Sequence, residues 1–210
     1  QFDKYLTREK EERSSRKVDA IELVFSTSLQ KKNIIQALER AQVVAEAVNF
    51  TRNLINEPAN VMNPQEIADR ARQVAREGKL RVEVLGVEQI KKLGMGGVIG
   101  VSQGSHNPPE FIILEHGSAY KAQGTICLVG KGVTFDTGGI SIKPSRDMEK
   151  MKYDMSGAAT VIGVMKAVSC LKPKLHIVAI APCVENMPGG GAQRDRKSTR
   201  LNSSHRIRTR

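Results

Sequence analysis

A glycine- and serine-rich loop between apolar segments constrains the fold of this chain more than any other feature of its sequence. The loop covers residues 131–146 and follows an apolar strand predicted at 125–129. A helix predicted from about 155 to 171 and an apolar strand at 175–181 come after it. Strand, loop, helix and strand in this order indicate an α/β fold with helices flanking a mixed, largely parallel sheet. Because ligands gather at the carboxyl ends of strands in such sheets, we expect a functional site at this loop.

The upstream sequence continues the alternation of helices and strands. A helix without Gly or Pro is predicted from Lys31 to about Ile55, preceded by a short strand at 20–25. A second helix is predicted from about Pro64 to Gly78, with Asn63 as its N-cap. The remaining predicted elements are a strand at 80–85, a short helix at 88–93, and strands at 98–102 and 111–115.

The net charge of +11 belongs mostly to the end of the chain and does not indicate a nucleic-acid partner. Residues 194–210 carry seven Lys or Arg and one acid, whereas the other 193 residues carry 26 bases and 21 acids. This tail lacks hydrophobic periodicity, which predicts disorder. Its stretch 195–205 resembles a translated sequencing adapter, so we expect residues 191–210 to be a disordered artefact.

The cysteine content and the hydropathy of the sequence indicate the cellular compartment in which we expect the protein. Cys127, Cys170 and Cys183 are odd in number and widely spaced in apolar segments, which predicts buried free thiols in a reducing compartment. No apolar run approaches the roughly 18–20 residues that a membrane span needs, and the N-terminus does not read as a signal peptide. We expect a cytoplasmic protein without a membrane partner.

Four ionisable residues of the loop region could carry chemistry: Lys131, Asp136, Lys143 and Asp154. A phosphate-binding loop is disfavoured, because the pattern would need Gly at Thr125 and Ser or Thr at Gly132. Two carboxylates separated by 18 residues across a glycine-rich loop can converge on hard divalent cations. The spacing alone leaves open that these side chains are simply solvated. Met148, Met151 and Met155 would share a face of a helix, which ordinary packing also explains.

The two stretches 129–145 and 147–159 resemble the signature region of the leucyl aminopeptidase family. Supporting similarities are found at residues 56–60, 93–97, 103–104, 109–112 and 181–188. The resemblance covers roughly residues 2–190. It implies that residues 1–30 are an interdomain connecting segment and that residues 31–190 are the N-terminal part of a catalytic domain.

The resemblance also implies a role for each candidate residue. Lys131 would donate its amine to one of two metals, Asp136 would bridge both, and Asp154 would bind the same metal as Lys131. Lys143 would act as a catalytic electrophile towards the substrate carbonyl, since a cation stabilises a developing oxyanion. Met151 would line the pocket for the N-terminal side chain of the substrate. A lysine ligand must be neutral, although the ordinary pKa of lysine is about 10.4, so metal coordination must favour loss of its proton.

The activity implied by the resemblance is that of a metal-dependent aminopeptidase, which releases leucine-type N-terminal residues by a two-metal-activated water. In the complete enzyme we expect two divalent metal ions (Mn²⁺ or Zn²⁺, with Mg²⁺ as a further candidate), peptide substrates with a free N-terminus, and a homo-hexamer.

One expected part of the family pattern is missing from this sequence. The second family signature supplies two further carboxylate ligands and a catalytic arginine, and the chain diverges at about residues 189–193 before reaching it. We therefore expect the 210-residue chain to be an incomplete, inactive portion of the enzyme, with an exposed sheet edge and apolar face. The alternative is a truncated, non-catalytic relative that serves as a binding or assembly module.

Overall fold

The computed structural model describes residues 2, 4–5, 18, 20–24 and 31–193. The chain divides into two compact units, residues 1–42 and residues 43–210. In the first unit, residues 20–24 have no regular secondary structure and are exposed. The strand predicted there is therefore wrong over residues 20–24, where the apolar side chains are exposed and pair with no strand among the described residues. Phe25 lies outside the described residues. The rest of the predicted tail after residue 193 also lies outside them.

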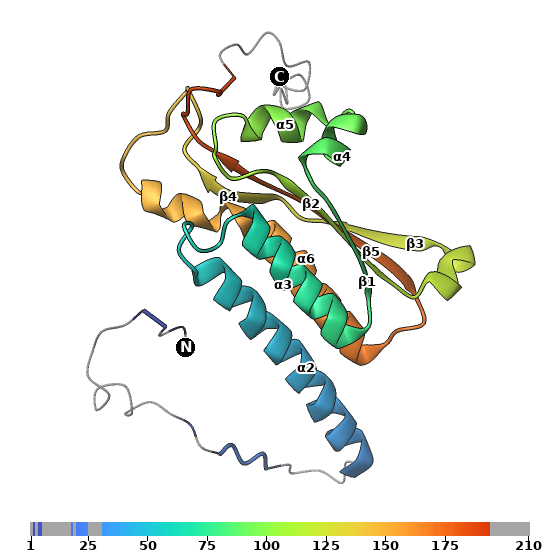
Figure 1. Ribbon diagram of the computed structural model, residues 1–210. Coiled ribbons are helices and arrows are strands. Elements are labelled where there is room, and N and C mark those ends of the chain that lie inside the picture. Colours follow the sequence, from blue (N-terminus) through green and yellow to red (C-terminus); the bar gives the residue numbers. More distant parts are fainter. Residues whose placement is uncertain (1, 3, 6–17, 19, 25–30, 194–210) are drawn as a thin grey trace, which may run out of the picture. The chain divides into compact units, whose positions relative to one another are not determined.

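The second unit is built on a five-stranded mixed sheet (Figure 1). Its strands are β1 (Arg81–Leu85), β2 (Glu110–His116), β3 (Thr125–Val129), β4 (Gly132–Asp136) and β5 (His176–Asn186). The order is β1-β2-β5-β3, and β4 also pairs with β5. β1 with β2 and β2 with β5 are antiparallel, whereas β3 and β4 are both parallel to β5. The predicted α/β architecture with a mixed sheet flanked by helices is confirmed.

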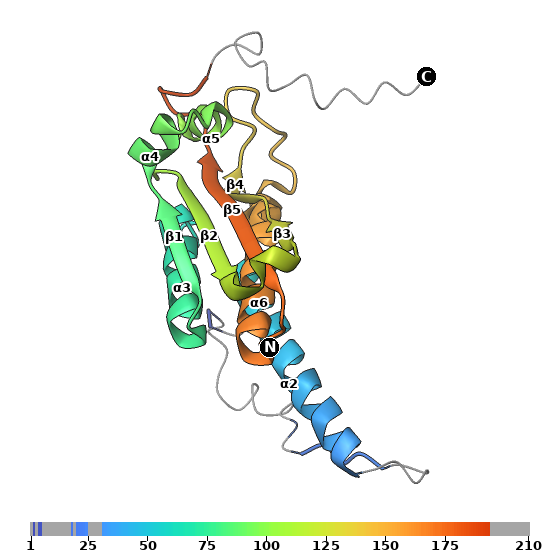
Figure 2. The ribbon, with the colours of Figure 1, turned by 90° about the vertical axis from the view of Figure 1, so that its right-hand side faces the viewer.

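The core lies between this sheet and the helices α3 (Pro64–Gly78) and α6 (Ser156–Leu171) (Figure 2). Alternate residues of β5 are buried against the helices, as the period of a strand requires. The predicted cap of α3 is confirmed, because the Asn63 side chain accepts a hydrogen bond of 2.9 Å from the Glu66 N–H. The largest fully buried side chains include Ile67, Ile112, Leu114, Ile162 and Met165.

The helix α2 (Lys31–Asn56) ends where the sequence predicts it to end. Pro58 disfavours helical geometry at Glu57, and the Pro58 carbonyl accepts hydrogen bonds from the following turn. The carbonyl of Asn56 accepts a hydrogen bond of 3.0 Å from Lys152. This bond anchors the 3-10 helix η2 (Met148–Met155), which leads into α6.

Two further expectations for the secondary structure are corrected. Residues 98–102 belong to helix α5 (Gly96–Ser102), which follows α4 (Val87–Lys92) and packs on β5. A short apolar run does not distinguish a strand from a short helix, and here Val98 and Ile99 both bond back to the Met95 carbonyl. The loop predicted at 131–146 contains strand β4, whose glycine, threonine and aspartate content hid it.

The cysteines are all free, but only Cys183 is buried. Burial strongly raises the pKa of its thiol, which leaves it unreactive. Cys127 and Cys170 are exposed, contrary to expectation. Cys127 lies on β3, beside Leu128 but on the opposite face of the strand from the helix-packed core, and Cys170 lies near the end of α6.

One helical stretch, Met148–Leu171, is long and apolar enough to cross a membrane by composition. Half of its apolar window is buried inside the fold, and α6 packs on β5 and α3. Packing in the core therefore accounts for its apolar character.

Candidate functional site

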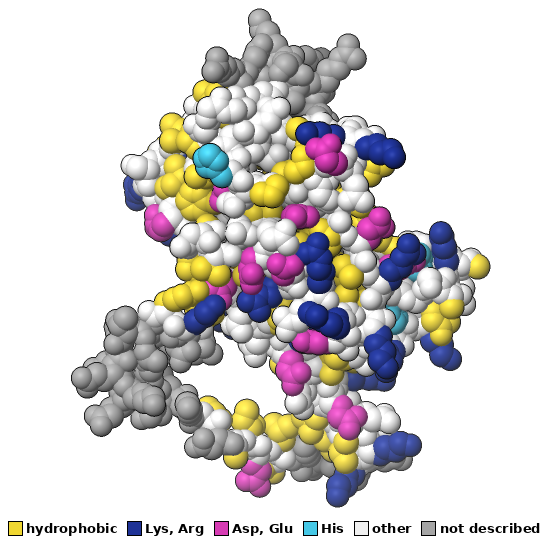
Figure 3. All heavy atoms as spheres, viewed as in Figure 1, with side chains coloured by type: hydrophobic (Ala, Val, Ile, Leu, Met, Phe, Trp, Pro, Cys, Tyr) yellow, Lys and Arg dark blue, Asp and Glu magenta, His cyan; other side chains and the backbone are white. Residues whose placement is uncertain are grey.

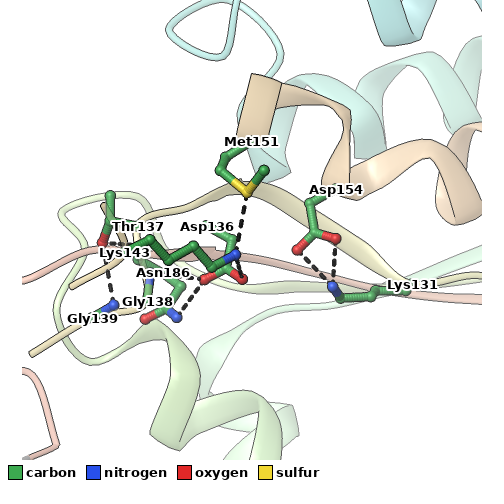
Figure 4. Close-up of polar contacts among 9 residues, drawn as sticks. All are labelled: Lys131, Asp136, Thr137, Gly138, Gly139, Lys143, Met151, Asp154 and Asn186. Atoms are coloured by element: carbon green, nitrogen blue, oxygen red, sulfur yellow. Dashed lines mark hydrogen bonds and ion pairs between the residues drawn. The ribbon is translucent and has the colours of Figure 1, made fainter. Parts of the chain in front are cut away.

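The loop region brings all five sequence-predicted site residues into two neighbouring groups (Figure 4). Lys131 lies immediately before β4, and Asp136 ends that strand. Lys143 lies in the loop that follows, while Met151 and Asp154 lie three residues apart on η2. Residues at this spacing share a face of a 3-10 helix, and η2 packs against β4. Lys131 thus follows the carboxyl end of β3 and Asp136 lies at the carboxyl end of β4, and both strands run parallel to β5.

The first group is an ion pair between Lys131 and Asp154. The Lys131 Nζ lies 2.5 Å from both carboxylate oxygens of Asp154. The backbone of Lys131 is held by its carbonyl, which accepts a hydrogen bond of 2.8 Å from the Ala158 N–H. A Cβ on Gly157 would lie 2.7 Å from the Lys131 nitrogen, so only glycine lets the start of α6 approach this closely.

The second group joins Lys143 to Asp136 and Met151. The Lys143 Nζ donates to the Asp136 Oδ2 at 2.6 Å and lies 3.2 Å from the Met151 sulfur. The main chain of Lys143 is fixed by a hydrogen bond of 2.8 Å from its N–H to the Thr137 carbonyl. The Asp136 side chain is 18% exposed and that of Lys143 is 37% exposed, so solvent only partly screens this pair.

Asp136 has two further donors on its other carboxylate oxygen. The Gly138 N–H donates to Oδ1 at 3.1 Å and the Asn186 side-chain amide donates at 2.7 Å. Burial by itself raises the pKa of Asp136, but the hydrogen bonds from its donors outweigh burial and hold that pKa below its ordinary value. Asp136 is therefore ionised at neutral pH.

Asn186 is the site residue that sequence reasoning missed. It belongs to the stretch 181–188, which carries part of the family resemblance, and that was the only signal available for it. Its contact with Asp136 joins residues 50 positions apart and depends on the pairing of β4 with β5. Spacing along the chain does not reveal such a contact.

The carboxylate and amine donors of these side chains are of types that bind divalent cations, but they are too few to complete a two-metal centre. Among the residues that the structure describes, no three His, Cys, Asp or Glu side chains gather. The available donors are the carboxylates of Asp136 and Asp154 and the amine of Lys131. Ions of the calcium and magnesium type take about six ligands each, and two carboxylates cannot neutralise two dications. A hollow of about 300 Å³ lies beside Lys131 and is lined otherwise by apolar side chains and a glycine.

Solved structures of a related enzyme resemble the fold. The structure titled bottromycin maturation enzyme BotP matches with a TM-score of 0.75 at 34% identity, covering 92% of this chain and 38% of that one. A structure of that enzyme in complex with Mn matches with a TM-score of 0.70 at 38% identity, covering 76% of this chain and 34% of that one.

The sequence comparisons identify the family directly. A probable cytosol aminopeptidase of Solibacter usitatus is 54% identical over 160 residues, which are 75% of this chain and 33% of the relative. One from Brucella melitensis is 46% identical over 193 residues, or 92% of this chain and 39% of the relative. The chain thus spans between a third and two fifths of the length of these relatives. The catalytic domain of the cytosol aminopeptidase family matches residues 49–208, and this chain belongs to that family.

Proposed function

We propose that the complete protein is a metal-dependent aminopeptidase that releases leucine-type N-terminal residues from peptides, and that this chain supplies part of its active site. The observation that carries the proposal is the pairing of Lys131 with Asp154 beside the pairing of Lys143 with Asp136, in a member of the cytosol aminopeptidase family. A related structure contains Mn, which supports a divalent metal in this site.

Three side chains of this chain would hold metal. Asp136 would bridge two ions, and Asp154 and Lys131 would share one of them. Lys131 would have to lose its proton to donate its lone pair, and it would then share an ion with Asp154 in place of their direct contact. Bound divalent ions would supply Lewis acidity towards the peptide carbonyl, a site for the free α-amine and a more acidic water. We propose Mn²⁺ or Zn²⁺ for these positions, with Mg²⁺ as a further candidate.

Lys143 and Met151 would act on the substrate rather than on a metal. As a cation, Lys143 would stabilise through its Nζ the negative oxygen that develops when the peptide carbonyl is attacked. Met151 touches the Lys143 Nζ through its sulfur, so its flexible side chain lies beside the reacting group. Met151 would therefore shape the space for the N-terminal side chain of the substrate.

The 210-residue chain by itself would be inactive, because its donors do not fill a two-metal centre. The missing ligands and a second catalytic cation would come from a part of the protein that this sequence does not contain. We further propose a cytoplasmic homo-hexamer that acts on peptides with a free N-terminus, without nucleic-acid or membrane partners. On the face shown in Figure 3, basic and acidic side chains of the described residues are interspersed rather than gathered into one basic surface.

The test compares the complete protein of this gene with the 210-residue chain. With Mn²⁺, the complete protein should hydrolyse Leu-p-nitroanilide but not its N-acetylated form, and a chelator should abolish turnover. The 210-residue chain should show no turnover under the same conditions. Asp136→Asn and Lys143→Ala in the complete protein should each lower kcat by at least about 100-fold, in line with the loss of electrostatic stabilisation. Equal turnover of the blocked substrate, or full activity with chelator, would contradict the proposal.

A further inference from the structure

Asn186 contacts the site through both its main chain and its side chain. Its carbonyl accepts hydrogen bonds from the Thr137 N–H at 3.0 Å and from the Thr137 hydroxyl at 2.8 Å. Its side-chain amide donates to the Asp136 Oδ1 at 2.7 Å (Figure 4). Asn186, the last residue of β5, therefore bonds to both Asp136 and Thr137, where β4 ends and the loop that carries Lys143 begins.

An irregularity in β4 sets Asp136 opposite Asn186. Val133 pairs with Val184 and Asp136 pairs with Asn186, so β4 uses three steps where β5 uses two. The extra residue makes a bulge, which re-aims the side chains that follow it. Thr134 fixes this point, since it is fully buried and its hydroxyl donates to the Val184 carbonyl at 3.2 Å.

The loop also wraps closely around the Asn186 amide. Gly139 has φ +66, and a Cβ there would lie 2.9 Å from the Asn186 Oδ1. The Gly139 N–H donates to the Thr137 hydroxyl at 3.2 Å, and the Lys143 N–H donates to the Thr137 carbonyl. The hydrogen bonds that start at Asn186 thus continue to the backbone of Lys143.

We infer that Asn186 is a positioning residue for Asp136: its amide binds Oδ1 and so fixes the orientation in which Oδ2 faces a cation, which is the Lys143 ammonium in this structure. The amide and the Gly138 N–H both occupy Oδ1, and Oδ2 is bonded to the Lys143 ammonium. A neutral amide holds the carboxylate without neutralising it, so Asp136 keeps its full charge for a metal. The inference rests on the metal role proposed for Asp136, and partners of metal ligands commonly govern affinity.

The chain offers a matched control in Asn107. The Asn107 amide donates to the Glu185 carboxylate at 3.0 Å, which is also an amide-to-carboxylate hydrogen bond. Glu185 directly precedes Asn186 on β5. Glu185 is not among the proposed ligands. Loss of the Asn107 amide therefore removes a comparable hydrogen bond near the site without touching Asp136.

The experiment titrates the complete protein of this gene with Mn²⁺ alone and follows the free ion by electron paramagnetic resonance. Asn186→Leu should weaken Mn²⁺ binding by about 10- to 100-fold, whereas Asn107→Leu should leave it unchanged. In the Asp136→Asn background, Asn186→Leu should have no further effect, because no carboxylate is left to position. Urea unfolding reports the fold of each variant, and Asn186→Ser replaces Asn186→Leu if the latter does not fold.

Three results overturn the inference. Mn²⁺ binding by Asn186→Leu that equals the wild type would show that the amide does not position the carboxylate. A loss that persists in the Asp136→Asn background would show a general structural effect instead. If the wild type and Asp136→Asn are indistinguishable, whether or not they bind Mn²⁺, the proposed metal role of Asp136 fails and the inference fails with it.

Discussion

At the scale of single residues, close backbone contacts decide which substitutions the site region tolerates. Gly132 begins β4 where it runs beside β5 and the start of α6. A Cβ there would lie 2.7 Å from the Cys183 sulfur and 2.7 Å from the Pro182 carbonyl oxygen. Neither neighbour is the far end of a flexible side chain, so the strand itself would have to move.

Gly132→Ala should therefore lower the free energy of unfolding by about 1–3 kcal/mol, the usual cost of overpacking. Gly96→Ala is the matched control, because a Cβ at Gly96 meets no atom within 4 Å. The control should be neutral or stabilising by a few tenths to about 1 kcal/mol, since Ala favours a helix. Urea unfolding followed by circular dichroism measures both, and equal effects of the two substitutions would contradict the prediction.

From the buried carboxyl of Glu110 we predict that the free energy of unfolding depends on pH. The residue is 8% exposed, and burial raises the pKa of its carboxyl although the charge of Arg72 opposes this. Because its pKa is higher in the folded state, ionisation of Glu110 costs stability at neutral pH and the cost disappears as pH falls below the unfolded pKa, about 4.3.

Glu110→Gln should thus unfold at higher urea concentration than the wild type at neutral pH. The difference should shrink as the pH falls below the unfolded pKa and vanish at about pH 3, where the carboxyl is almost wholly protonated in both states. Glu83→Gln makes the same change on an exposed side chain of β1 and should shift the neutral midpoint little. A gain for Glu110→Gln that does not vary with pH would argue against burial as its cause.

At the scale of elements, the sequence predicts those that have a clear period or a cap. Helices α2, α3 and α6 and strands β1, β2 and β3 follow from periodicity, Asn63 and the glycine that ends α3. Strand β4 was missed because its residues favour loops, and pairing with the apolar β5 overrides that preference. Likewise the candidates Lys131 and Asp136 follow from a motif, whereas Asn186 follows only from strand register.

A buried histidine joins three strands at the end of the sheet opposite to the site. The His176 Nδ1 lies 2.7 Å from the Thr125 hydroxyl of β3, and its Nε2 lies 3.0 Å from the Glu115 carboxylate of β2. His176 itself begins β5 and is 4% exposed. The ring of His176, on β5, is thus a buried hydrogen-bond partner for both Thr125 and Glu115.

His176→Phe should destabilise the fold by about 1–3 kcal/mol, because it leaves two polar groups without their buried partner. His106→Phe changes the same residue type at an exposed position and should stay within about 0.5 kcal/mol of the wild type. Thermal unfolding of the two variants at neutral pH separates these cases. A His176→Phe variant as stable as the wild type would show that the bridge contributes little.

At the scale of the whole molecule, the described sheet has an open edge. Strands β3 and β4 pair with β5 and, among residues 31–193, with no strand on their other side. Val129 at the end of β3 is 71% exposed and Ile126 is 47% exposed. Unpaired edges with exposed apolar side chains promote association between chains.

The 210-residue chain should therefore associate as its concentration rises, and Val129→Lys should reduce that association. A charge on an edge strand opposes pairing with a second chain. Val24→Lys places the same charge at an exposed valine outside the sheet and should have a smaller effect. Analytical ultracentrifugation over a range of concentrations measures the difference, and equal effects of the two lysines would exclude the β3 edge as the contact.

The position of β5 has a consequence for how the chain acquires its site. It is the last of the described strands to be synthesised, yet β2, β3 and β4 all pair with it. Asp136 and Asn186 are separated by 50 residues, so their contact requires closure of a long loop, which is slow compared with the formation of local helices. On the ribosome, the Asp136 carboxylate therefore cannot bond to the Asn186 amide until residue 186 has emerged. The site is thus assembled in the late steps of folding.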